Sequence, residues 1–172
     1  MRIALAVDGS RMSSVAARHV VALQRALAAR EPVAVIYVDE PLMQAVALKL
    51  GAAGSQRYHE ENAAHALRGV RAALKRAGIE YRERLLIGDP ASRIVEAAGK
   101  ERCDLLVMGS HGRGAMKSLF LGSVTMKVIA QSKVPVTWCV AVLPNDGRHG
   151  VPHVPADVPW RERDGDRIAL PA

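Results

Sequence analysis

Five short apolar segments alternate with longer segments of helical periodicity, and this alternation limits the possible folds of the chain more than any other feature. The apolar segments are residues 2–7, 33–38, 79–87, 105–108 and 134–142. Between the first two, apolar residues such as Val15, Val20 and Leu23 recur at helical spacing. Because β–α–β crossovers are right-handed, the pattern predicts one doubly wound, five-stranded parallel sheet with helices on both faces, an α/β fold.

Two of the expected strands carry signs of a position near the edge of the sheet. Residues 79–87 alternate apolar and polar side chains, which indicates a strand with one less buried face. In residues 134–142, Pro135 lacks a backbone donor, which suits a strand start or an edge. Residues 42–50 predict one or two helical turns, and residues 51–55 (GAAGS) then predict a flexible joint.

The length and composition of the chain limit the class of protein to which it can belong. The chain has 172 residues, of which 49 % are apolar and 3 % aromatic, so it is long enough for one domain with an aliphatic core. No apolar run approaches the roughly 20 residues that span a bilayer. The N-terminal apolar run stops at Asp8, too early for a signal peptide, so we expect a soluble cytoplasmic protein. Cys103 and Cys139 lack metal-ligand spacing and are predicted to be reduced, partly buried thiols.

The net charge of +7 is concentrated before the C-terminal tail, residues 144–172, which holds four arginines and five acids. Basic residues of the body are scattered along helical faces without interleaved aromatics, so a nucleic-acid surface is not expected. A positive field would favour a small anionic ligand. The tail is rich in proline and poor in periodicity, which predicts a partly disordered extension of a domain formed by residues 1–143.

The glycine-bearing stretch 109–125 (GSHGRGAMKSLFLGSVT) joins the fourth expected strand to a helix that begins near Ser123. Glycines let backbone N–H groups approach phosphate oxygens, and a helix start offers unpaired N–H groups with partial positive charge. The stretch is therefore predicted to be a phosphate cradle. Arg113 within it is expected to face the ligand, whereas His111 suits either a phosphate contact or a solvent-facing position.

The same stretch excludes two large classes of nucleotide-binding protein. GxxxxGK[ST] is absent, and the GxG at Gly112 and Gly114 lacks a third glycine at Lys117, so neither a Walker loop nor a dinucleotide fingerprint is present. No nucleophile–base set and no paired carboxylates accompany the loop. We therefore expect a protein that binds a phosphate-bearing ligand rather than an enzyme.

Other candidate residues lie where strands are expected to end. In parallel sheets, ligands bind at the carboxyl ends of the strands, where strand order reverses. Asp8 follows the first strand, Val38 ends the second and Gly109 follows the fourth. If the first and fourth strands are neighbours, these residues converge. Asp8 would then accept a ribose hydroxyl or hold a metal-bound water; its alternative role is a helix N-cap.

The spacing of Gly109, Gly112 and Gly122-Ser123 resembles the signature of the universal stress protein family, in particular its nucleotide-binding branch. Three further segments resemble parts of the family pattern: Val7-Asp8-Gly9-Ser10, Gly88-Asp89-Pro90 and Val134-Pro135-Val136. Together they cover residues 2–142, whereas the tail lies outside the resemblance. Two positions depart from the family pattern, since Trp138 and Cys139 stand where members usually have aliphatic residues.

The resemblance implies a Rossmann-like domain with strand order 3-2-1-4-5 that binds ATP with Mg²⁺, forms a homodimer through its last strand and serves as a stress or regulatory factor. Asp8 then corresponds to the acidic group near the ribose and Val38 to the position whose backbone meets adenine. The full set of expected cofactor-binding residues is Ala6, Val7, Asp8, Val38, Met108, Gly109, Gly112, Arg113, Gly122, Ser123, Val124 and Thr125. Two alternatives remain: a slow ATPase or phosphotransferase using the same cradle, and a module that binds a regulatory protein through its basic surface or tail.

Overall fold

A computed structural model describes residues 1–28, 30–112, 121–140, 160–163 and 166–169. The chain divides into two compact units, Met1–Ala141 and Val142–Ala172, which we describe separately. Within the described residues, no helix is both long enough and apolar enough to cross a lipid bilayer.

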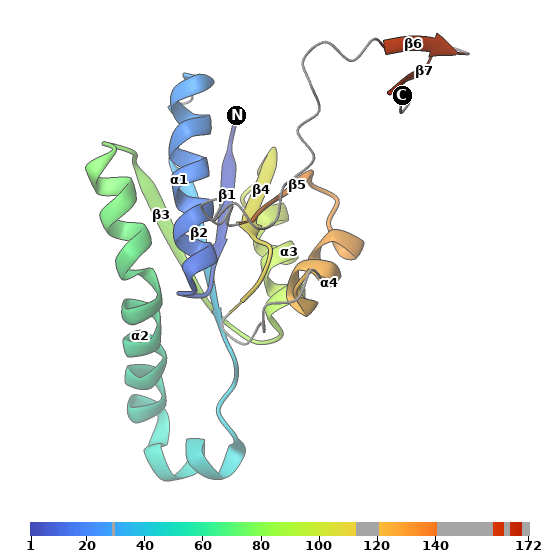
Figure 1. The fold of residues 1–172 in the computed structure, drawn as a ribbon. Helices are drawn as coiled ribbons and strands as arrows, with labels where there is room; N and C mark the ends of the chain where they lie inside the picture. Colours follow the sequence, from blue (N-terminus) through green and yellow to red (C-terminus); the bar gives the residue numbers. More distant parts are fainter. Residues whose placement is uncertain (29, 113–120, 141–159, 164–165, 170–172) are drawn as a thin grey trace, which may run out of the picture. The chain divides into compact units, whose positions relative to one another are not determined.

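The first unit contains one parallel sheet with strand order β3-β2-β1-β4-β5, as predicted (Figure 1). Its strands are β1 (Ile3–Val7), β2 (Val33–Asp39), β3 (Tyr81–Ile87), β4 (Leu105–Gly109) and β5 (Val136–Cys139). Its helices are α1 (Arg11–Ala26), α2 (Gln44–Arg76), α3 (Pro90–Lys100) and α4 (Ser123–Gln131). The α/β fold class predicted from the alternating pattern is confirmed.

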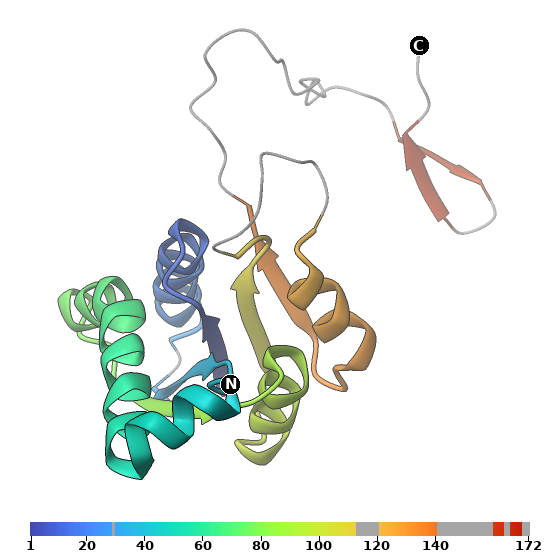
Figure 2. The same ribbon diagram turned by 90° about the horizontal axis from the view of Figure 1, so that it is seen from below.

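Two separate hydrophobic cores flank the sheet. One core joins β-strand side chains such as Leu5 and Tyr37 to apolar residues of α1 and α2, including Leu67. The other joins Ala6 and Ile36, on the opposite side of the same strands, to residues of α3 and α4. Figure 2 shows α1 and α2 on one side of the sheet and α3 and α4 on the other. This division follows from right-handed crossovers, because the chain winds outward to β3 and then returns past β1 to β4.

β1 lies at the centre of the sheet, between β2 and β4. Ala6 pairs in register with Met108 on β4 and with Ile36 on β2. The carboxyl ends of these strands therefore meet at one edge, which brings the segments after them together, as expected for adjacent first and fourth strands. β3 and β5 are the edge strands, as the alternation in residues 79–87 and Pro135 predicted.

α2 is a long helix with a sharp joint at Gly51. The backbone of Gly51 has φ 67° and ψ 178°, whereas the residues on both sides are helical. The joint is thus confined to Gly51, and residues 52–55, predicted to be part of it, instead begin the longer helical segment. The difference arises because one residue with positive φ suffices to reorient a helix, so the small residues after it remain free to continue helically.

The second unit contains an antiparallel hairpin formed by β6 (Trp160–Arg163) and β7 (Asp166–Ala169). These two strands were not predicted from the sequence. The predicted disorder of the tail concerns mainly residues that lie outside the described ranges.

Candidate functional site

The segment after β1 is held by the carboxylate of Asp8. Its Oδ1 accepts hydrogen bonds from the backbone N–H of Ser10 at 2.9 Å and from the hydroxyl of Ser13 at 2.7 Å. The Asp8 N–H donates to the same Ser13 hydroxyl at 2.9 Å. Ser10, not Asp8, is the N-cap of α1, since its side chain accepts from Ser13 N–H. The alternative N-cap role of Asp8 is therefore not observed, and Asp8 instead orders the loop before the helix.

The segment after β4 is fixed at both of its described ends. The N–H of Gly122 donates to the carbonyl of Ser110 at 2.8 Å. The hydroxyl of Thr125, a buried side chain, donates to the carbonyl of Gly109 at 3.1 Å. Thr125 was predicted to be a cofactor-binding residue, and in the structure its hydroxyl ties the start of α4 to the end of β4. These two bonds keep the helix start beside the strand end while residues 113–120 between them lie outside the described ranges.

Two glycines lie where a side chain would not fit. A Cβ atom on Gly109 would lie 2.5 Å from the Cβ of Met12 in α1. A Cβ atom on Gly112 would lie 2.9 Å from Oδ2 of Asp8. Both distances are below any normal contact, so a side chain at Gly109 would clash with α1, and one at Gly112 would force the Asp8 carboxylate to move. The second distance also shows that the segments after β1 and β4 meet at Asp8 and Gly112.

The start of α4 lies beside this meeting point, because a Cβ atom on Gly122 would lie 3.8 Å from the backbone nitrogen of Gly112. Gly122 is the N-cap and provides no side-chain hydrogen bond to the first turn. That turn contains no acidic residue, and Ser123 is exposed whereas Val124 is half-buried. The free N–H groups and the dipole of a helix start favour a nearby anion, by about 0.3–1 kcal/mol for the dipole at an exposed site. The geometry can therefore hold an anionic group without further rearrangement of the helix.

The remaining predicted residues lie on the strands or outside the described ranges. Ala6, Val7 and Met108 are buried in the strands that lead to the site. Val38 is half-buried at the end of β2 and packs against the core formed with α3 and α4. Arg113 lies outside the described residues.

Several residues that build the site were not predicted as members. Ser13 is one of them, because its hydroxyl accepts from the Asp8 N–H and donates to the Asp8 carboxylate. Met12 occupies the space beside Gly109. Ser110 is buried, and its hydroxyl lies 2.9 Å from Nδ1 of His111. A serine five residues after the strand-end aspartate was the one sequence signal that could have indicated the Asp8–Ser13 pair.

The described residues contain no cluster of three or more His, Cys, Asp or Glu side chains suited to a metal ion. Mg²⁺ is usually bound in proteins by one or two carboxylates together with substrate phosphates and waters. Asp8 is the carboxylate placed for such a role. Cys103 and Cys139 are buried free thiols, as predicted, and burial raises the pKa of both, so neither is a thiolate nucleophile at neutral pH.

Comparison with known proteins identifies the family. Residues 1–139 match the universal stress protein family. The chain belongs to this family. Universal stress protein MJ0577 of Methanocaldococcus jannaschii is 30 % identical over 149 residues, which cover 78 % of this chain and 91 % of that protein. The solved structure of MJ0577 matches with a TM-score of 0.67 at 27 % identity, over 80 % of this chain and 93 % of that one.

A second solved relative carries a bound nucleotide. A universal stress protein crystallised in complex with cAMP matches this universal stress protein with a TM-score of 0.57 at 25 % identity, covering 81 % of this chain and 95 % of that chain. The tail beyond residue 139 lies outside the family match, in agreement with the extent of the sequence resemblance.

Proposed function

We propose that this universal stress protein binds ATP, together with Mg²⁺, at the site formed by the ends of β1 and β4 and the start of α4. The observation that carries the proposal is the contact of Gly112 with Asp8, where a Cβ atom would lie 2.9 Å from the carboxylate. This contact brings a glycine backbone beside an acidic group, and the N-cap of α4 lies next to them, because a Cβ atom on Gly122 would lie 3.8 Å from the backbone nitrogen of Gly112. Phosphates suit the helix start, a ribose hydroxyl or metal-bound water suits Asp8, and the backbone at Val38 suits adenine. The cAMP complex of a relative supports a nucleotide as the ligand class.

The proposed role is that of a cytoplasmic, nucleotide-dependent regulatory factor rather than an enzyme. Asp8 already accepts two hydrogen bonds through Oδ1, which suits it to hold a loop and a ligand more than to act as a general base. We expect at most very slow ATP hydrolysis. Phosphate release well above background in the wild type, and lost in Asp8→Asn, would contradict this part of the proposal.

The proposed assembly is a homodimer formed through β5. β5 pairs with β4 on one side, and the described residues include no strand on its other side. Trp138 and the adjoining Val140 are 46 % and 56 % exposed. An unpaired edge with large apolar side chains favours pairing with a second copy across a two-fold axis.

The test of the nucleotide site uses one substitution at two glycines. In Gly112→Ala the new methyl group would displace the Asp8 carboxylate, so we expect ATP binding to weaken at least tenfold. Gly99→Ala is the matched control, because Gly99 lies in α3 with open space around it. Isothermal titration calorimetry with MgATP measures both affinities. Equal affinity of Gly112→Ala and the wild type would contradict the proposed site.

A further inference from the structure

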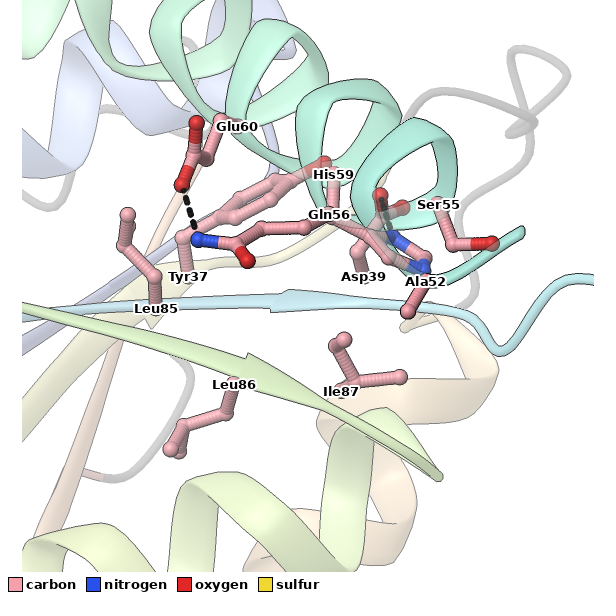
Figure 3. Close-up of a pocket in the computed structure, with 10 residues that line it drawn as sticks. All are labelled: Tyr37, Asp39, Ala52, Ser55, Gln56, His59, Glu60, Leu85, Leu86 and Ile87. Carbon is pink, nitrogen blue, oxygen red and sulfur yellow. Dashed lines mark hydrogen bonds and ion pairs between the residues drawn. The ribbon is translucent and has the colours of Figure 1, made fainter. Parts of the chain in front are cut away.

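A cavity of about 430 Å³ lies between α2 and the carboxyl-terminal halves of β2 and β3, apart from the nucleotide site (Figure 3). Its volume lies within the roughly 300–1,000 Å³ typical of small-molecule pockets. The residues that line it are Tyr37, Asp39, Ala52, Ser55, Gln56, His59, Glu60, Leu85, Leu86 and Ile87. No part of the predicted site described above contributes to it.

The cavity exists because α2 leaves part of β3 uncovered. Leu85 and Ile87 are 47 % and 44 % exposed, although their register partners on β2, Tyr37 and Asp39, are buried. Strands of a parallel sheet normally have both faces covered. Here the overlying helix presents small or polar side chains, among them Ala52, so the strand face stays open to a ligand.

The cavity and the Val38 side chain lie on different faces of β2. Side chains alternate between the two faces of a strand. Tyr37 packs in the core formed with α1 and α2, whereas Val38 packs against the core formed with α3 and α4. The cavity is lined by Tyr37 and Asp39 and therefore opens on the α2 side, away from the Val38 side chain.

One polar pair marks the wall of the cavity. Nδ1 of His59 lies 2.8 Å from Oδ2 of Asp39, and the amide of Asn62 donates to the same oxygen at 2.9 Å. Figure 3 shows the His59 ring between Asp39 and Ala52. When Nδ1 donates to the carboxylate, Nε2 of a neutral ring is an acceptor. Among the hydrogen bonds of the described residues, none involves this Nε2.

The charges of the lining residues disfavour an anionic ligand. Asp39 is paired with His59, and Glu60, an exposed residue, accepts a hydrogen bond from Gln56 at 2.8 Å. The lining residues include no lysine or arginine. A carboxylate or phosphate would therefore meet acidic neighbours and no lysine or arginine, whereas a hydroxyl donor would find an acceptor in a neutral His59 ring.

We infer that this cavity is a second ligand site, which takes a small, neutral, mainly apolar molecule carrying a hydroxyl group. The apolar body lies on Leu85 and Ile87 beneath the helix, and the hydroxyl donates to Nε2 of His59. Binding in this cavity does not require that the proposed nucleotide site binds a nucleotide, because the two sites share no lining residue.

The probe for this site is 2-naphthol, a neutral fused ring with one hydroxyl, followed by its fluorescence. Naphthalene lacks the donor and 2-naphthoate carries a charge. We expect 2-naphthol to bind about threefold to tenfold more tightly than naphthalene, the effect of one hydrogen bond, and 2-naphthoate to bind most weakly. This comparison uses the wild-type chain alone, so it does not depend on the folding of a variant. Equal binding of the three probes would overturn the inference.

A pair of variants then locates the probe. Ala52→Phe fills the cavity from an exposed helix position, and we expect it to weaken 2-naphthol binding at least tenfold. Ala53→Phe, the same change at the next exposed residue, which does not line the cavity, is expected to leave binding unchanged. ATP should not displace 2-naphthol. Unaltered binding in Ala52→Phe, or displacement of the probe by ATP, would overturn the inference.

Discussion

Asp39 is a nearly buried carboxylate whose stability contribution depends on pH. Its side chain is 11 % exposed. Burial by itself raises the pKa of Asp39, but the hydrogen bonds from His59 and Asn62 together outweigh it and hold the pKa below its ordinary value. A carboxyl group with a lowered folded-state pKa stabilises the fold above its unfolded pKa, and this contribution is lost as pH falls through the folded pKa.

We therefore predict that Asp39→Asn costs about 1–3 kcal/mol of unfolding free energy at pH 7, the range for disrupting buried hydrogen bonds. The difference from the wild type should begin to shrink below about pH 4, where the carboxyl group of the unfolded chain becomes protonated, and should be lost as pH falls through the lower folded-state pKa of Asp39. Urea denaturation across this pH range measures it. Glu61→Gln is the control, because Glu61 is exposed on α2. An Asp39→Asn deficit that is constant from pH 7 to pH 3 would contradict the prediction.

Individual side chains also show how far the candidate site could be predicted. The sequence correctly placed Gly109 at a strand end and Gly122 at a helix start. The close approach of Gly112 to Asp8 was not predicted. The glycine spacing could not show that the Thr125 hydroxyl binds the Gly109 carbonyl, because that depends on how α4 is oriented against β4. The role of Ser13 likewise depends on the turn after β1, which local sequence leaves open.

At the level of elements, the joint in α2 depends on one glycine. Gly51 has φ 67° and ψ 178°, a backbone region that is essentially restricted to glycine, and a Cβ atom there would meet nothing within 4 Å. This position therefore requires glycine because of its backbone conformation, and not because a side chain would clash with a neighbour. The joint sets the direction of residues 44–50 relative to the helical segment that roofs the second cavity.

We predict that Gly51→Ala lowers the local stability of residues 44–50 by about 1–3 kcal/mol, the cost of a side chain in this region. Amide hydrogen exchange of residues 44–50 measures the change. Gly99→Ala, in the open surroundings of α3, should instead stabilise its helix by up to about 1 kcal/mol. Unchanged exchange in Gly51→Ala would mean that the joint tolerates a side chain and would contradict the argument.

The sequence predicted these elements well where periodicity alone decides them. Alternating apolar and helical segments gave the order of strands and helices, and polar alternation in residues 79–87 placed β3 at an edge. The exposure of Leu85 and Ile87 could not be predicted, because it depends on which residues of α2 lie opposite them. The strands β6 and β7 were not predicted, because the prolines and charged residues of the tail obscure the pattern typical of short strands.

At the level of the whole molecule, the proposed homodimer depends on the edge of β5 opposite β4, which pairs with no strand among the described residues. We predict that Trp138→Lys shifts the protein from dimer to monomer, because it places a charge among the exposed apolar side chains of that edge. Sedimentation velocity at several protein concentrations measures the assembly. Leu48→Lys makes the same kind of change at an exposed leucine of α2 and should leave the dimer intact. A Trp138→Lys dimer of wild-type affinity would contradict assembly through β5.

We propose that the segments after β1 and β4 and the start of α4 together bind a nucleotide. An MgATP titration followed by backbone amide chemical shifts in a ¹H–¹⁵N spectrum tests this binding at single residues. We expect saturable shifts concentrated at Asp8, Gly109, Gly112, Ser123 and Val124, with little change at Ala52 or His59 beside the second cavity. Absence of saturable shifts, or shifts concentrated away from these residues, would contradict it.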